Sequence, residues 1–470
     1  MQQQNGLTTE NAASRKWWVF LVVGIGTFMS ALDGSVVNII VPVLRAYFKS
    51  DVASVEWVVV VYLLAVSSLL LTFGRLGDLR GHKAMYSAGF LIFVAASTVC
   101  GLAPTVTVLV AARTVQAIGA AMLFANAPAI LTRSFPPQQR GQALGLQATM
   151  TYLGLTVGPS LGGWLTQSIS WRAVFYINVP IGLLAFILSL VFIPADKPDT
   201  ARTERFDLPG AVLFATGLGA LLLALNQGDA WGWASPAVII CAAAAVMLLG
   251  IFLRVELRTP SPMLDLSLFN QRIFSASTAS AVLNYICLYS VIFLMPFYLL
   301  QGRGLNPAQA GLLLTAQPII MAIVAPVSGA LSDRIGSRLL STLGMLVMAV
   351  GIFLLSLLKP DAANGAILFG LAITGLGTGI FISPNTSALM GSAPRQRQGI
   401  ASGILATARN VGMVLGVGLA GAILTSVMAR SGGGLGASAL FAAVHTGLLV
   451  GAGLAVVGAV ISLIRGGAKT

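Results

Sequence analysis

One acidic side chain in this sequence lies where a charge is costly. Of the 14 Asp and Glu residues, only Asp33 falls deep within an apolar run, the one near 17–44. A charged group near the centre of a bilayer costs on the order of 3 kcal/mol by insertion scales, so such a residue usually has a function. Burial in apolar surroundings favours the neutral carboxyl form. The position of Asp33 therefore predicts a group that binds and releases a proton.

A basic residue is available to pair with this acid. Arg113 lies inside the apolar run near 105–131, at a depth in its run that matches that of Asp33 at about 1.5 Å per helical residue. If the two helices adjoin, the side chains form a charge pair. The sequence leaves two interpretations open, a pair that titrates during transport and a fixed structural ion pair.

Other kinds of chemistry find little support. The sequence contains no G-x-x-x-x-G-K-[ST] motif, so ATP is not expected to be the direct energy source. With 2 His and 3 Cys residues scattered along the chain, we expect no metal site, no cofactor and no enzyme activity. The formal net charge is +13, but no long basic run is present, and nucleic-acid binding is not expected.

The elements that hold these residues are predicted to be membrane helices. The chain is 57% hydrophobic and only 9% charged, far below the charge of soluble domains. Its apolar runs reach the ~20 residues that cross a bilayer, and such spans must be helical. The runs predict fourteen helices, near 17–44, 54–73, 84–103, 105–131, 141–167, 171–193, 208–226, 235–257, 272–300, 309–331, 338–358, 364–390, 399–428 and 440–464.

The basic residues predict the orientation. Most of the 27 Lys and Arg residues fall between spans that would face the cytoplasm if the amino terminus is inside. We therefore expect a multi-pass protein of the bacterial plasma (inner) membrane with both termini cytoplasmic. The expected division is a tail at 1–16, a six-helix bundle at 17–193, a linker with two extra helices at 194–271, and a second six-helix bundle with a short tail at 272–470.

Two segments of the chain repeat. The stretch from Gly74 to Lys83 recurs 255 residues later, from Gly329 to Arg338. Glycines of the span near 141–167 recur 258 residues later, as in Gly154 and Gly412. Parallel repeats of six helices are typical of transporters.

Through these motifs, the whole chain resembles the major facilitator superfamily and, within it, the fourteen-helix drug:proton antiporter family. The resemblance rests on a first-helix motif at Leu32–Pro42, a loop motif at Gly74–Lys83, a fourth-helix motif at Arg113–Gly119 and a fifth-helix motif at Gly154–Gly163. It implies an all-α polytopic fold of two six-helix bundles and two extra helices. The fifth-helix motif is the form found in exporters.

The resemblance and the residue chemistry together predict the functional positions. Asp33 and Arg113 are expected to couple transport to protons. The repeated loop is expected to form a cytoplasmic gate from Gly74, Asp78, Arg80, Gly81 and Lys83, with Asp333 and Arg334 as its weaker copy. The exporter motif comprises Gly154, Gly158, Pro159, Gly162 and Gly163, whose spacing by four lets another backbone approach closely. Substrate is expected to contact Asn38, Gln116, Asn284, Tyr285, Tyr289 and Arg409.

The function expected from the sequence is proton-coupled export of small amphipathic compounds by alternating access. The alternative is a dedicated exporter of a single metabolite, antibiotic or siderophore that uses the same mechanism. The partners would be a small-molecule substrate, protons and the lipid bilayer, and we expect a monomer.

Overall fold

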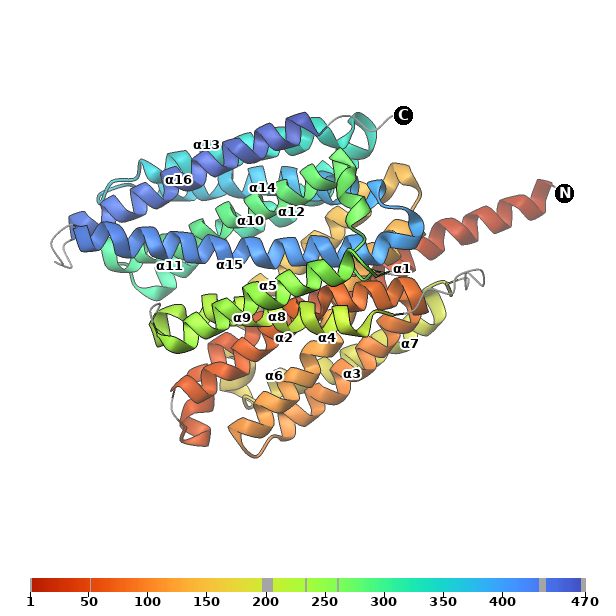
Figure 1. Cartoon of the computed structure of the whole chain (residues 1–470), viewed down its shortest axis with the longest axis horizontal. Helices are drawn as coiled ribbons and strands as arrows, with labels where there is room; N and C mark the ends of the chain where they lie inside the picture. The colour runs from red at the N-terminus through yellow and green to blue at the C-terminus, as the bar shows by residue number, and fades with distance from the viewer. Residues whose placement is uncertain are drawn as a thin grey trace. The chain divides into compact units, whose positions relative to one another are not determined.

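Helices make up almost all of the chain in the computed structural model (Figure 1). The structure describes residues 2–50, 52–196, 206–232, 235–259, 262–430 and 437–465. In these ranges, 13 helices are long and apolar enough to cross a membrane, and no strand occurs. The remaining expected span, 141–167, forms α5 (Arg140–Ser168), which is long enough but rich in Gly, Gln and Thr. The all-α polytopic fold is confirmed.

The chain divides into two compact units. The first comprises residues 1–266 and 393–407, and the second comprises 267–392 and 408–470. The helices of the first unit are α1 (Gln2–Phe48), α2 (Val52–Arg80), α3 (His82–Leu102), α4 (Val106–Ser134), α5, α6 (Ala173–Tyr176), α7 (Asn178–Phe192), α8 (Leu208–Trp231) and α9 (Pro236–Glu256). Those of the second are α10 (Arg272–Pro296), α11 (Pro307–Leu314), α12 (Ala316–Ile335), α13 (Ser337–Ser356), α14 (Asn364–Ser392) and α16 (Ala437–Ile464). Helix α15 (Gln398–Arg430) contributes residues to both units.

Several expected spans are interrupted. The span near 171–193 is broken at Ile177 into α6 and α7. The span near 272–300 ends in a π-helical turn, Phe297–Gly302, directly after Pro296. The span near 309–331 is broken at Thr315. At the amino terminus α1 begins at Gln2, so the helix extends back through the expected tail.

The repeat predicted from the sequence is visible in the backbone. Gly81 and Gly336, 255 residues apart, both adopt positive φ angles of 98° and 86° at the turns before α3 and α13. Gly119 and Gly377 make the same close approach to the preceding helix, and a Cβ on either would lie within 2.8 Å of the carbonyl oxygen of Gly89 or Gly344. Each half therefore contains the same close contact between two of its own helices, in addition to the repeated sequence.

The extra pair of helices belongs to the first unit. Helices α8 and α9 pack against each other, and α8 also packs on α2. The buried Glu256, at the end of α9, accepts hydrogen bonds from the backbone N–H groups of Met263 and Leu264 at 3.2 and 3.0 Å. Asp265 then forms an ion pair of 3.4 Å with Arg397, just before α15. The segment after α9 is thus tied to the start of α15.

The glycine face of α5 packs against α1. A Cβ on Gly154 would lie 2.6 Å from the carbonyl oxygen of Phe28, and one on Gly162 would lie 2.5 Å from Val36 Cγ2. Ser35 closes the contact, because its hydroxyl donates to the carbonyl oxygens of Leu32 and Gly154 at 3.1 and 3.3 Å. Helix α5 continues through Pro159. The expected exporter motif therefore provides the close approach of two helix backbones around the segment that carries Asp33.

This packing predicts opposite outcomes for two neighbouring glycines. In Gly158→Ala the new Cβ would lie 2.0 Å from Ser35 Oγ, whereas no atom lies within 4 Å of a Cβ on Gly163. We expect Gly158→Ala to lower the free energy of unfolding by about 1–3 kcal/mol, because of overpacking. Gly163→Ala, the matched control, should leave it almost unchanged. Denaturant unfolding in detergent measures both, and equal values would contradict the packing described.

Candidate functional site

Asp33 and Arg113 meet inside the first unit. The two side chains lie on α1 and α4, and both are fully buried. Arg113 Nη1 donates to Asp33 Oδ2, and Arg113 Nε donates to the carbonyl oxygen of Val58 at 3.2 Å. The charge pair expected from their matching depths is thus present in the structure.

The second carboxylate oxygen of Asp33 is held by two amide side chains. Gln116 Nε2 and Asn178 Nδ2 each donate to Asp33 Oδ1 at 3.0 Å. Gln116 is itself fixed, since its Nε2 donates to Ser97 Oγ at 2.7 Å and its Oε1 accepts from Arg113 at 2.7 Å. A carboxylate that accepts this many hydrogen bonds is stabilised in its charged form. Both carboxylate oxygens of Asp33 therefore have hydrogen-bond donors.

An aromatic ring completes the surroundings of the guanidinium group. Arg113 Cζ lies 4.1 Å from the ring centroid of Tyr62, a cation–π distance, and Tyr62 donates its hydroxyl proton to the carbonyl oxygen of Ser30 at 3.1 Å. Arg113 Nη2 is buried without a hydrogen-bond partner among the described residues. The guanidinium group thus has one buried donor that the described contacts leave unused.

An apolar cluster closes the pair off at one end of the unit. It starts at Leu32, directly beside Asp33 in the sequence, and continues along α1 to Leu44. Val55 from α2 and Trp171 and Phe175 from the segment around α6 complete it. Asp33 is fully buried next to this packing, so access from this end requires the cluster to open.

At the two corresponding positions, which the structure describes, the second repeat has no such pair. Gly158 packs beside Leu32 and, 258 residues later, Gly416 packs beside Ile286, which places Cys287 at the position of Asp33. The buried Cys287 donates its thiol to the carbonyl oxygen of Gly451 at 3.3 Å. The position of Arg113 corresponds in the same register to Leu371, which is also fully buried. The charge site is therefore confined to one repeat.

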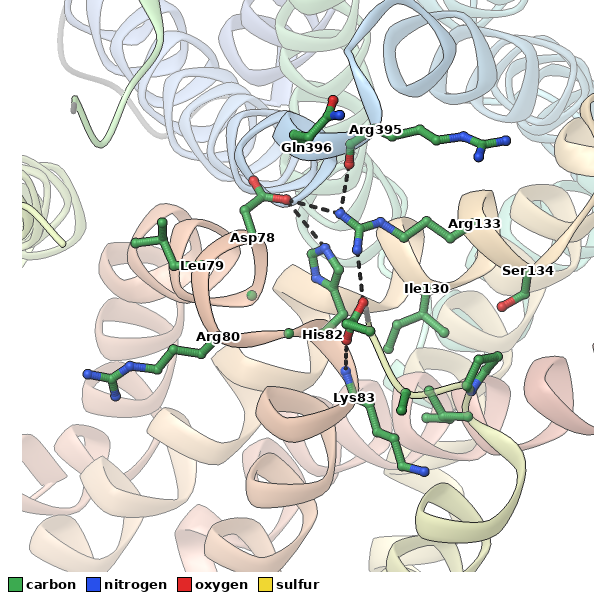
Figure 2. Close-up of a pocket in the computed structure, with 16 residues that line it drawn as sticks. Asp78, Leu79, Arg80, His82, Lys83, Ile130, Arg133, Ser134, Arg395 and Gln396 are labelled. Carbon is green, nitrogen blue, oxygen red and sulfur yellow. Dashed lines mark hydrogen bonds and ion pairs between the residues drawn. The ribbon is translucent and has the colours of Figure 1, made fainter. Parts of the chain in front are cut away.

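Asp78 of the repeated loop binds the start of α15. Its carboxylate accepts the backbone N–H groups of Gly399 and Ile400, each at 2.8 Å. Arg133 Nη2 lies 3.5 Å from Asp78 Oδ1 and donates to the carbonyl oxygen of Arg395 at 2.7 Å (Figure 2). A carboxylate at a helix amino terminus satisfies free N–H groups and matches the helix dipole. We call Asp78, Arg133 and the backbone N–H groups of Gly399 and Ile400 the Asp78 latch.

The glycines of this loop explain part of its motif. A Cβ on Gly74 would lie 2.2 Å from the carbonyl oxygen of Gly399, so only glycine allows α2 and α15 to approach this closely. The latch borders a cavity of about 480 Å³. Lys83 Nζ donates to the carbonyl oxygen of Leu190 at 2.7 Å, and the exposed side chain of Arg80 points away from the latch (Figure 2). In the second repeat, Asp333 is half-buried and Arg334 exposed at the end of α12.

The residues expected to contact substrate lie in different surroundings. Gln116 and Asn284 are both fully buried. Gln116 is bonded to Asp33, whereas the amide group of Asn284 donates to the sulfur atoms of Met345 and Met348 at 3.5 and 3.2 Å. Tyr285, Tyr289 and Arg409 are half-buried. The side chain of Asn38 lies outside the described residues.

Sequence reasoning missed three residues that these contacts bring to light. Asn178 and Tyr62 belong to the Asp33 site, and Arg133, in the last turn of α4, contacts Asp78. A polar Asn in the apolar span near 171–193 is a signal by which Asn178 could have been found. Nothing in the sequence indicated which helix would place its tyrosine on Arg113.

Comparisons with known proteins agree with this fold. The family model described as Major Facilitator Superfamily matches residues 23–270 and 277–465. The human organic anion transporter MFSD10 superposes with a TM-score of 0.66 at 14% identity, covering 95% of this chain and 99% of MFSD10. At this identity the likeness concerns the fold alone.

Two curated relatives are similar over most of their length. The riboflavin transporter RibZ of Clostridioides difficile is 36% identical over 417 residues, 89% of each protein. The multidrug resistance protein Stp of Mycobacterium tuberculosis is 32% identical over 407 residues, 86% of this chain and 75% of Stp. With the family model and these relatives in agreement, the chain belongs to the Major Facilitator Superfamily, within its drug-efflux family.

Proposed function

We propose that this protein is a proton-coupled antiporter that exports small amphipathic compounds from the cytoplasm. The observation that carries the proposal is the buried Asp33, whose carboxylate accepts hydrogen bonds from Arg113, Gln116 and Asn178. It is the only acidic residue deep in an apolar run of the sequence. An ionisable residue inside a membrane is by default a functional site.

The chemistry of the pair supports coupling to a conformational change. Proton binding neutralises Asp33 and leaves the Arg113 guanidinium buried beside a neutral acid, which costs several kcal/mol if no other partner is found. Loss of the charge pair also weakens the contact between α1 and α4. The protonated form therefore favours a rearranged packing of these helices, and deprotonation restores the pair.

One deep carboxylate predicts a low stoichiometry. We expect few protons per transport cycle and no strong demand for a doubly charged substrate. The named activities of Stp, a multidrug resistance protein, and RibZ, a riboflavin transporter, support an amphipathic or planar organic substrate. A dedicated exporter of one metabolite would use the same machinery and would respond to a single member of a substrate panel.

The membrane orientation follows from the charges of the loops. We place the protein in the bacterial inner membrane with both termini in the cytoplasm, because most Lys and Arg residues then face inward. In this orientation the Asp78 latch lies on the cytoplasmic side, and the apolar cluster next to Asp33 lies on the outer side. An outer proton reaches Asp33 only after that cluster opens.

Replacement of Asp33 tests the coupling directly. Asp33→Asn keeps the shape of the side chain but cannot carry a proton, so we expect substrate-dependent proton movement to fall to the background of empty proteoliposomes. A pH-sensitive dye reports this movement against a panel of lipophilic cations, neutral drugs and riboflavin. Asp361→Asn, at an exposed acid, is the matched control and should exchange like the unchanged protein. Proton exchange retained in Asp33→Asn would contradict the proposal.

A second prediction separates a titrating pair from a fixed structural one. Arg113→Met leaves the Asp33 carboxylate buried without its counter-charge, and we expect the free energy of unfolding to fall by about 3–5 kcal/mol at alkaline pH. At acidic pH the loss should shrink, because proton uptake by Asp33 removes the unpaired charge. Denaturant unfolding in detergent measures both values. In an Asp33→Asn background the same substitution should show no such pH dependence, and an identical profile in both backgrounds would exclude Asp33 as the titrating group.

A further inference from the structure

The imidazole of His82 lies between two polar side chains at the base of the Asp78 latch. His82 is the first residue of α3, directly after the turn at Gly81, and only 1% of its surface is exposed. Its Nδ1 lies 2.7 Å from Asn126 Oδ1. Its Nε2 lies 3.3 Å from Asp78 Oδ1 (Figure 2). The ring thus bridges α4 and α2.

The orientation of Asn126 fixes which atoms of this bridge carry hydrogen. Asn126 Nδ2 donates to the carbonyl oxygens of Met122 and Phe73, at 2.8 and 3.3 Å. These oxygens can only accept, so the atom of Asn126 that faces His82 is the carbonyl oxygen Oδ1. That oxygen is also an acceptor, and the short contact to His82 therefore requires a proton on Nδ1.

The other ring nitrogen faces a carboxylate. His82 Nε2 has no hydrogen-bond partner in the described part of the chain, and Asp78 is its nearest ion-pair partner. A neutral imidazole with its proton on Nδ1 would leave Nε2 unprotonated at 3.3 Å from the Asp78 carboxylate. The other neutral form would point a lone pair at Asn126 Oδ1. The imidazolium keeps the hydrogen bond from Nδ1 and places a positive charge at ion-pair distance from Asp78.

The charged groups around the ring do not replace Asp78 as its partner. Arg133 approaches Asp78 from α4 but is directed mainly to Asp196 Oδ1, at 2.9 Å. Asp196, which follows α7, also accepts the backbone N–H of Lys83 at 3.1 Å. The charged and titratable groups that line the neighbouring cavity from the surrounding elements are Asp78, Arg80, Lys83, Arg133, Asp196 and Arg395.

We propose that His82 is a proton-binding site that controls how firmly Asp78 holds the start of α15. When the imidazole carries its second proton, it fixes the Asp78 carboxylate opposite the Gly399 and Ile400 amides. When that proton leaves, the Asp78 carboxylate loses the positive charge 3.3 Å away and the hold on α15 weakens. The stabilising contact is thus present at acidic pH and is lost as pH rises. This site is separate from Asp33 and does not depend on the proposed antiport.

Hydrogen exchange measures the hold on α15 directly. The full chain in lipid nanodiscs is labelled at about pH 5.5 to 8, the range in which histidine titrates, and a peptide containing Gly399 and Ile400 is followed by mass spectrometry. After correction for intrinsic exchange, we expect protection of these amides to fall about tenfold from the acidic to the alkaline end, as for a lost hydrogen bond to a charged group. In His82→Gln the protection should be low and independent of pH.

The chain supplies a matched control, because it contains 2 histidines. His445 donates from Nδ1 to the carbonyl oxygen of Ser356 in the second unit, so His445→Gln should keep the pH slope of the unchanged protein. A flat profile in the unchanged protein, or the same slope in His82→Gln, would overturn the proposal.

A second measurement does not require His82 to be replaced. In His445→Gln the only remaining imidazole signal in a proton NMR spectrum belongs to His82. Its titration midpoint should fall when Asp78→Asn is added, because the carboxylate no longer favours the imidazolium. An unchanged midpoint would show that the two groups do not interact and would also overturn the proposal.

Discussion

The pair of Asp33 and Arg113 imposes the strictest demand on the first unit. Removing two ions from water costs several kcal/mol for each, and their attraction offsets this only with good geometry and further hydrogen bonds. The structure meets the demand with groups from five helices. Helices α1 and α4 supply the charges, α7 supplies Asn178, α3 supplies Ser97 to hold Gln116, and α2 supplies the ring of Tyr62. The contacts that hold these five helices together are therefore the same contacts that hold the Asp33–Arg113 pair.

The carboxylate of Asp78, in the latch, is also buried, but it is stabilised by different groups. Asp78 is 1% exposed, but it faces the free N–H groups of a helix and an imidazole, with Arg133 at the limit of ion-pair distance. Arginine stays charged at any physiological pH, whereas histidine does not. The two proposals therefore differ in the group that binds the proton: at the first site it is the acid Asp33 itself, and at the Asp78 latch it is the neighbouring His82.

The sequence predicted the elements and the main charges for clear physical reasons. Length and apolarity of the runs determined the helices, and depth alone predicted that Asp33 and Arg113 could meet. The glycine spacing in α5 predicted a close helix contact but not that α1 lies on the other side. Gln116 was expected to contact the substrate, and the structure shows a bond from it to Asp33 that the sequence did not indicate. Such contacts join helices about 80 or more residues apart, and periodicity within one helix carries no information about them.

The low hydropathy of α5 and the break at Ile177 have a related cause. A helix that faces lipid needs an apolar surface, whereas α5 packs a face of glycines against α1. The break at Ile177 places Asn178 at the first residue of α7, beside Asp33. Departures from an ideal span thus coincide with the functional region in the first unit.

The thiol at the position of the acid in the second repeat also bears on how such a molecule can diverge. After a duplication, two copies of a charged site would each carry the cost of desolvation. With Cys287 and Leu371 in place of the ions, the second half is relieved of that cost at these two positions. These positions are then open to drift among neutral side chains. Changes of cargo during evolution are therefore expected to accumulate in the carboxy-terminal half, while the amino-terminal half stays fixed by its ions.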